Sequence, residues 1–182
     1  MNRIFSTLAA TNALALTITF GLGCWSKWGG TSIDVYLLHF LFGLFTGVLT
    51  LLVHCLIFTY LLGTGRWVRE VTLAYGFPDE PLYKRTRELK RVTFPVALGA
   101  MLMTIATSAA GGGVQLQGWP WVLHFLLGIA TLGVNYAAFI WEYRRVDENG
   151  RIIEKVLVEV DRVRAERGLP TNAEALANES AG

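Results

Sequence analysis

Two histidines of this chain stand inside nearly identical apolar stretches. Residues 38–43 read LHFLFG and residues 123–128 read LHFLLG, and each stretch opens a long apolar run. A histidine within such a run is energetically expensive and therefore indicates a functional site. Neutral imidazole is a good ligand for iron and other transition metals. The repeated pattern predicts that His39 and His124 together bind a metal.

A glycine follows each histidine by four residues, which places it one helical turn further along the same face. Gly43 and Gly128 would leave room between helices for a flat macrocycle, and two axial histidines complete the coordination of haem iron. We therefore expect one b-type haem between His39 and His124, with Gly43 and Gly128 beside it. The alternative is that both histidines are polar contacts between helices.

This pattern resembles the membrane-anchor b-type cytochromes of respiratory enzymes, in which haem lies in a helical bundle between histidines on transmembrane helices. The matching residues are His39, His124, Gly43 and Gly128. The resemblance covers two apolar spans, and the longer signatures of the succinate dehydrogenase, formate dehydrogenase and b561 families are missing. It implies a cytochrome b-like electron-transport subunit of a larger oxidoreductase-type membrane complex.

A third histidine, His54, follows His39 by fifteen residues. On one helix this spacing separates the two side chains by about 22 Å along the axis and by about 60° in rotation, so both can face a bundle interior. The position that matches His54 in the second stretch is Phe139. As a cofactor ligand, His54 would bind either a second haem, with a ligand from another subunit or with an open axial face, or a quinone. The alternative is a hydrogen bond to a nearby serine, threonine or backbone carbonyl.

The composition indicates which elements hold these residues. Of 182 residues, 53% are hydrophobic and only 16% are charged, with a mean hydropathy of +0.42, which is typical of a membrane protein. Apolar runs predict four spans, at about 5–25, 33–62, 94–112 and 119–143. The expected fold is an all-α integral membrane four-helix bundle over residues 1–146, built as two similar helical hairpins.

The predicted boundaries depend on glycines and prolines. Residues 63–65 read GTG and are expected to break or bend the second span, and 64–93 is expected to be a polar cytoplasmic connection. Pro95 is expected in the first turn of the third span. The apolar N-terminus is expected to be a retained span, with a cleaved signal peptide as the alternative.

Residues 147–182 have a different character and are expected to be a cytoplasmic helix and tail. Apolar residues recur at steps of three and four between 153 and 163, among many charges. This spacing predicts an amphipathic helix over 151–167. Its apolar face is expected to pack either in a groove of a partner subunit or against the chain's own cytoplasmic loop.

The distribution of charge predicts the orientation. Of 16 lysines and arginines, all but Lys27 lie on one side of the four predicted spans. The positive-inside rule then places both termini in the cytoplasm, in a multi-pass inner-membrane protein. The basic run at 84–91 is expected to contact anionic headgroups of the lipid bilayer rather than nucleic acid.

Other classes of function find little support. The two cysteines form no CxxC motif, and the chain contains no GxSxG, HExxH, P-loop or dinucleotide fingerprint. An enzyme that acts alone is therefore not expected. A transporter is disfavoured because no buried acidic or basic residue is expected within the spans. The alternative to an electron-transfer subunit is a non-redox structural or assembly subunit of a membrane complex.

Overall fold

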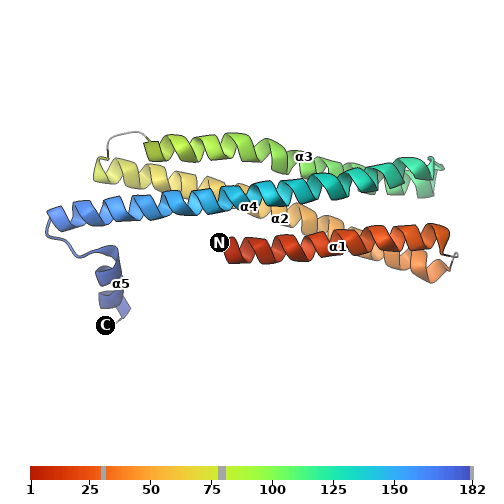
Figure 1. The fold of residues 1–182 in the computed structure, drawn as a ribbon, viewed down its shortest axis with the longest axis horizontal. Helices are drawn as coiled ribbons and strands as arrows, with labels where there is room; N and C mark the ends of the chain where they lie inside the picture. The colour runs from red at the N-terminus through yellow and green to blue at the C-terminus, as the bar shows by residue number, and fades with distance from the viewer. Residues whose placement is uncertain (30–31, 78–80, 181–182) are drawn as a thin grey trace.

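The computed structural model describes residues 1–29, 32–77 and 81–180. Within these ranges the regular structure is entirely helical, which confirms the all-α prediction. The helices are α1 Asn2–Trp28, α2 Ile33–Tyr75, α3 Pro81–Gln117, α4 Trp121–Glu166 and α5 Asn172–Ser180. The first four lie side by side in an elongated bundle, and the short α5 stands apart from it near the C-terminus (Figure 1).

Each of the four long helices is long and apolar enough to cross a membrane. Large apolar side chains point outward from the bundle; Leu44, Phe45, Leu126 and Ile140 are each between 57% and 60% exposed. Such a surface is unfavourable in water and suits lipid. The four predicted spans therefore correspond to α1, part of α2, part of α3 and part of α4.

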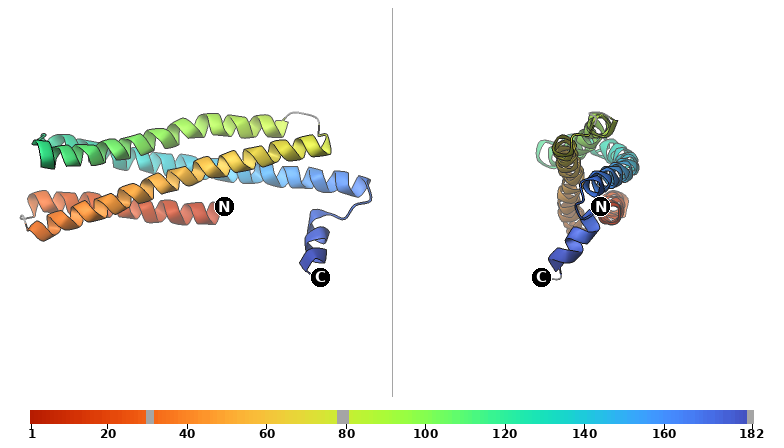
Figure 2. Two further views of the ribbon diagram at one scale, coloured as in Figure 1. Left: turned by 180° about the vertical axis from the view of Figure 1, so that it is seen from behind. Right: turned by 90° about the vertical axis from the view of Figure 1, so that its left-hand side faces the viewer.

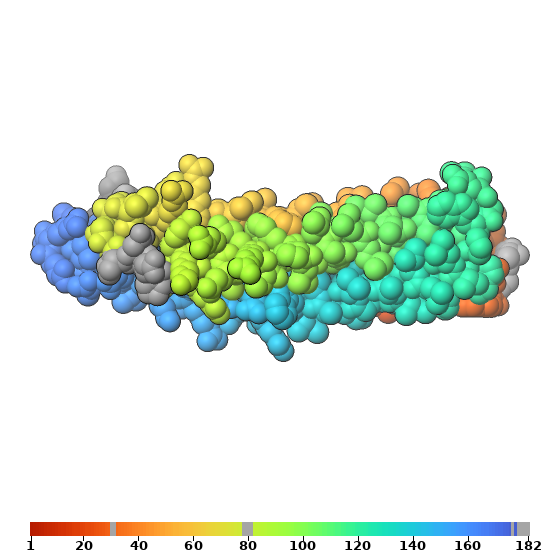
Figure 3. Space-filling model, turned by 90° about the horizontal axis from the view of Figure 1, so that it is seen from above, coloured from red at the N-terminus to blue at the C-terminus, as the bar shows by residue number. Residues whose placement is uncertain are grey.

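The helices α2 and α4 are much longer than a membrane requires. With 43 and 46 residues, they extend over about 65 and 70 Å at 1.5 Å per residue, whereas a bilayer core is about 30 Å thick. The helix α1 is shorter, so the N-terminus lies partway along the bundle (Figures 1 and 2). Beyond it only α2, α3 and α4 continue, and the molecule is a narrow rod (Figure 3).

The glycines that were expected to break α2 lie within an uninterrupted helix. A side chain at Gly65 would place its Cβ 2.9 Å from Nζ of Lys90, so this glycine allows α3 to approach closely. Thr64 accepts a hydrogen bond of 3.0 Å from Nδ2 of Asn149, which lies buried within α4. The predicted break in α2 is thus a contact point between continuous helices.

Pro95 lies within α3, which already begins at Pro81, so the expected start of the third span is well inside a helix. The ends of α2 follow ordinary capping rules. Oγ of Ser32 accepts a hydrogen bond from the backbone N–H of Val35, and Gly76 ends the helix in the left-handed region, with φ of 67°. Much of the expected connection at 64–93 is therefore helical.

Two clusters of buried apolar residues hold the bundle together. The first joins α1, α2 and α4 in the part of the bundle that includes α1; it consists of Phe5, Ala9, Leu16, Val53, Ile57, Leu61, Phe139 and Val146. The second joins α2, α3 and α4 beyond the start of α1; it consists of Val68, Leu89, Ile152, Val156 and Val160. The apolar face of residues 151–167 is therefore covered by the chain's own helices, the second of the two expected arrangements.

Candidate functional site

The two histidines of the repeated motif lie next to each other. His39 comes from α2 and His124 from α4, and their ring centroids are 6.1 Å apart with an angle of 68° between the planes. Both side chains are partly buried. The structure thus brings together the two residues that the sequence predicts as a metal-binding pair.

Each imidazole is held by a backbone carbonyl of the neighbouring helix. Nδ1 of His39 lies 3.0 Å from the carbonyl oxygen of Thr19 in α1, and Nδ1 of His124 lies 2.9 Å from that of Thr107 in α3. A carbonyl oxygen only accepts hydrogen bonds, so each Nδ1 carries the proton and donates it. Each Nε2 then keeps its lone pair, the arrangement usual for histidines that bind metals.

A glycine lies against each of these rings. A Cβ at Gly23 would be 2.9 Å from Cε1 of His39, and a Cβ at Gly111 would be 2.9 Å from Cε1 of His124. Both distances are too short for a real side chain. Gly23 follows Thr19 by four residues, and Gly111 follows Thr107 by four residues. The same pair of residue types therefore holds both histidines.

The predicted glycines Gly43 and Gly128 have different neighbours. A Cβ at Gly43 would be 3.4 Å from the methyl carbon of Thr19, and a Cβ at Gly128 would be 3.4 Å from the ring of Phe20. Both therefore face α1, in ordinary van der Waals contact. They allow close packing of α2 and α4 against α1, whereas Gly23 and Gly111 are the glycines that touch the histidines.

Threonines extend this pattern away from the histidines. Thr46 and Thr131 follow the two histidines by seven residues, and their hydroxyls lie 2.9 Å from Oγ1 of Thr19 and 2.5 Å from Oγ1 of Thr107. Eleven residues after each histidine stands another buried polar residue, Thr50 or Asn135, which donates a 2.8 Å hydrogen bond to the carbonyl of Thr46 or Thr131. We call each series of contacts a polar ladder.

The spacing of the two imidazoles is compatible with two axial ligands of one iron. Two imidazoles that bind one ion from opposite sides at about 2 Å have ring centroids about 6 Å apart, close to the value found here. The part of the chain that the structure describes contains no group of three or more His, Cys, Asp or Glu side chains that could enclose an ion. A porphyrin supplies four further nitrogens, so two protein ligands suffice for its iron.

Aromatic side chains of α1 and α4 cluster around Phe125, the residue that follows His124 in the sequence. Phe20 stacks on Phe125 with centroids 5.7 Å apart, and Trp28 meets Phe125 edge-on at 5.4 Å. Phe40 and Phe45, which stand close to His39 in the sequence, are more than half exposed and point away from the bundle. The aromatic contacts next to His124 in the sequence therefore come from α1 and α4, whereas Phe40 and Phe45 of α2 face outward.

His54 lies in the bundle interior and is fully buried. Its Nδ1 is 2.7 Å from Oε1 of Glu142, and its Nε2 is 3.0 Å from Oδ1 of Asn135. Its ring stacks on Phe139 with centroids 5.2 Å apart. Because both ring nitrogens are engaged, His54 has no free nitrogen for iron or a quinone in this arrangement; it is hydrogen-bonded, but to a glutamate and an asparagine rather than to a serine, threonine or backbone carbonyl.

Glu142 corrects one expectation from the sequence. It is fully buried, so the prediction that no acidic residue is buried within the spans is wrong. In the sequence, Glu142 directly precedes Tyr143, Arg144 and Arg145, so it was assigned with them to the membrane surface. The spacing gave a usable signal, because Asn135 and Glu142 lie seven residues apart and thus share one face of α4.

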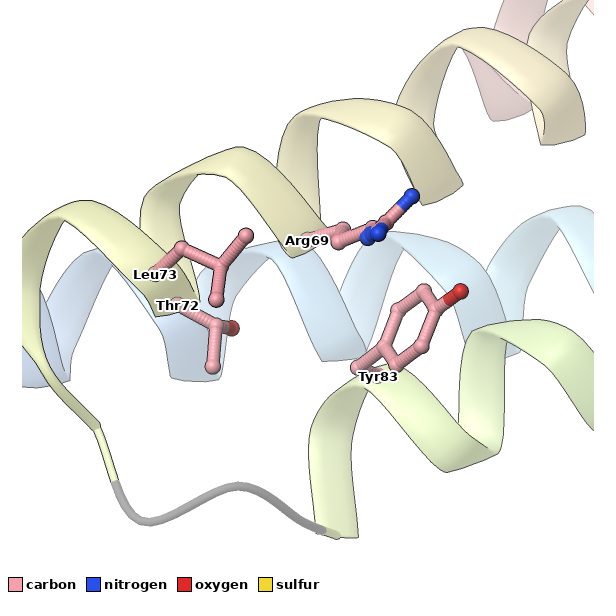
Figure 4. Close-up of a pocket in the computed structure, with 4 residues that line it drawn as sticks. All are labelled: Arg69, Thr72, Leu73 and Tyr83. Atoms are coloured by element: carbon pink, nitrogen blue, oxygen red, sulfur yellow. The ribbon is translucent and has the colours of Figure 1, made fainter.

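A pocket lies between α2 and α3, near the end of α2 and the start of α3 (Figure 4). Arg69, Thr72 and Leu73 of α2 and Tyr83 of α3 line this space of about 320 Å³. Arg69 follows His39 by thirty residues, which corresponds to about 45 Å along α2. No group of catalytic residues lines the pocket, so it does not contribute to the candidate site.

The sequence did not reveal the residues that hold the histidines. The carbonyls that hold the two rings belong to Thr19 and Thr107, which lie outside the repeated motif. The useful signal was the spacing from Thr to Gly, at 19 and 23 and again at 107 and 111. The chain matches no protein-family model, and comparison with curated proteins and with solved structures found no match either.

Proposed function

We propose that this chain is a multi-pass membrane protein of two similar helical hairpins that binds one b-type haem between His39 and His124. The observation that carries the proposal is the pair of imidazoles on opposite helices, each with its Nδ1 proton donated to a carbonyl and its Nε2 lone pair free. In this proposal haem supplies a reversible one-electron carrier, and the chain is an electron-transfer subunit.

The residues of the chain have separate roles in this proposal. His39 and His124 are the axial ligands, and the carbonyls of Thr19 and Thr107 set their tautomer and orientation. Gly23 and Gly111 let both rings lie against α1 and α3. We retain Gly43 and Gly128 as neighbours of the site through their packing against α1, and we do not assign His54 to metal or quinone.

The orientation follows from charge. Lys27 stands at the end of the bundle that holds the histidine pair, with its Nζ 4.8 Å above the ring of Trp121, and all other lysines and arginines precede or follow the apolar spans on the opposite side. We propose that both termini and the extended ends of α2, α3 and α4 are cytoplasmic. The haem then lies in the outer half of the inner membrane.

The decisive experiment is a reduced-minus-oxidised visible spectrum with a haem assay on detergent-purified protein. Wild type, His39→Ala and His124→Ala are compared after expression with ample haem. We expect about one haem per chain in wild type, and its loss in both variants. His54→Gln is the matched control, because it changes the third histidine and is expected to retain the spectrum.

Addition of imidazole separates a ligand from a packing residue. Free imidazole can occupy the space left by His39→Ala and bind iron, so we expect it to restore the spectrum of that variant. A colourless wild type that takes up no haem on reconstitution would overturn the proposal. The two histidines would then be contacts between helices in a structural or assembly subunit.

A further inference from the structure

The molecule contains a second polar site, separate from the histidine pair. His54 of α2 and Glu142 of α4 are both fully buried, with 2.7 Å between Nδ1 and Oε1. His54 follows His39 by fifteen residues, which places this pair about 22 Å further toward the proposed cytoplasmic side. Ionisable groups inside a membrane span are rare and mark ion or proton sites.

The environment of the pair leaves the carboxylate incompletely satisfied. Oε2 of Glu142 has no hydrogen-bond partner among the residues that the structure describes. Asn135 occupies Nε2 of His54, and the stacked ring of Phe139 covers one face of the imidazole. The pair therefore binds a proton in the space between the two groups, and the free oxygen is available for a second one or for water.

Within the described part of the chain, further buried polar atoms without hydrogen-bond partners lie toward the proposed cytoplasmic end. On α4 they are Nε of Arg145 and Oδ1 of Asn149, and on α3 Oγ1 of Thr93. Residues 142, 145 and 149 follow each other at steps of three and four and so share one face of α4. Such unsatisfied groups are the usual partners of buried water, which conducts protons.

Other charges do not neutralise the pair. Arg145 is one turn from Glu142, but its guanidinium stacks over Trp141 at 4.3 Å and donates to Glu148 at 2.8 Å. The remaining titratable or charged side chains nearest along the four packed helices are Arg3 on α1, Cys55, Tyr60 and Arg66 on α2, Arg91 on α3, and Tyr136, Tyr143, Arg144 and Asp147 on α4. A proton that binds to His54 and Glu142 therefore adds a positive charge to the bundle interior that no described neighbouring side chain balances.

We propose that His54 and Glu142 form a proton-binding site that takes up one proton from the cytoplasmic side when the haem is reduced. This inference rests on the proposed haem site. A one-electron donor, such as a reduced dye mediator, converts ferric to ferrous haem, and a proton from cytoplasmic water binds to Oε2 of Glu142, which has no partner among the described residues. The electron and the proton together leave the charge of the membrane interior unchanged.

The distance between the haem and the His54–Glu142 pair determines how strongly reduction of the haem changes the proton affinity of the pair. At about 20 Å and an effective dielectric constant of about 10, one unit of charge on the haem changes the proton affinity of the pair roughly tenfold. The midpoint potential of the haem should therefore fall with rising pH over a window of about one pH unit. Outside that window it should be constant.

The test is a redox titration of the haem spectrum at a series of pH values. We expect a sloping region in wild type and its loss in Glu142→Gln, which keeps the shape of the side chain but removes its charge. Thr50→Val is the matched control, because Thr50 occupies the position equivalent to Asn135 and carries no titratable group. It is expected to keep the slope.

A second measurement covers the case in which Glu142→Gln does not fold. The redox-difference infrared spectrum of wild type should contain carboxyl or imidazole bands that shift in D2O. Haem that titrates with no dependence on pH and no such bands would overturn the proton site alone, as would a slope that persists in Glu142→Gln. A wild type without haem would instead overturn the proposed function, and the coupling with it.

Discussion

The half of the bundle made by α1 and α2 and the half made by α3 and α4 use the same contacts around their histidines and then diverge. Both have the Thr carbonyl, the glycine against the ring and the threonine seven residues after the histidine. Fifteen residues after the histidine, the first half has His54 and the second has Phe139, and these two rings stack on each other. The shared part serves the paired site, and the divergent part adds the site of His54 and Glu142.

The largest effect is expected where the halves differ. His54→Phe makes the first half like the second but leaves Glu142 buried without its partner, so we expect the free energy of unfolding to fall by about 3 kcal/mol. His54→Phe with Glu142→Leu should recover more than half of that loss. Unfolding in mixed detergent and SDS micelles measures both. A double variant as unstable as the single one would show that the pair acts through packing alone.

A smaller effect is expected where the halves agree. Gly23→Ala and Gly111→Ala would each place a Cβ 2.9 Å from a histidine ring and force that ring to move. We expect each to lower haem binding by a similar amount, of about 1–3 kcal/mol. Gly21→Ala and Gly112→Ala are matched controls, since nothing lies within 4 Å of a Cβ at either position. Haem per chain at limiting haem supply is the measurement, and equal losses in the controls would contradict the assigned contacts.

The threonine–threonine hydrogen bonds of the two polar ladders should each have a weaker effect, of the same size in both ladders. Thr46→Val and Thr131→Val each remove a hydroxyl that bonds a threonine of the neighbouring helix. Hydrogen bonds between membrane helices contribute about 0.6 kcal/mol on average, so we expect both variants to lose roughly that amount. The same micelle unfolding assay applies. A difference of more than about 1 kcal/mol between the two would mean that the ladders are not equivalent.

The smallest effect is expected outside both halves, in α5. The backbone N–H and the hydroxyl of Thr171 both bond to Oε2 of Glu174, and this lowers the pKa of that carboxyl. A lowered pKa means that the stabilisation of α5 is present above the ordinary pKa of a glutamate and disappears as the pH falls below it. Amide NMR of protein with labelled alanine should show this loss in wild type, whereas Glu174→Gln should show little dependence on pH.

The sequence predicted the elements whose signals are local. Apolar runs located the four long helices, and the repeated motif identified the histidine pair that the structure places together. It failed where glycine has a tertiary role. Gly65 was expected to break or bend α2, yet it lies in a continuous helix and allows the close approach of Lys90. Packing against neighbouring helices outweighs the weak intrinsic preference of such residues.

The buried carboxylate was hidden for a related reason. Glu142 precedes a tyrosine and two arginines, so a reading along the sequence assigns all of them to the membrane surface. Around the helix, however, these side chains point in different directions, and only Glu142 reaches His54. The partner of a polar side chain in a bundle depends on the rotation of its helix about the helix axis and on which helix packs against it. The order of residues along the sequence specifies neither.

Because α4 is one continuous helix, a change of its angle at one end moves its other end. It begins beside the histidine pair and continues without interruption to Glu166, 46 residues in all. Over the roughly 60 Å beyond His124, a tilt of about 1° at one end displaces the other end by about 1 Å. Two ends of one rod cannot respond independently, so any adjustment of the angle of α4 at His124 is also a displacement of the surface at its far end.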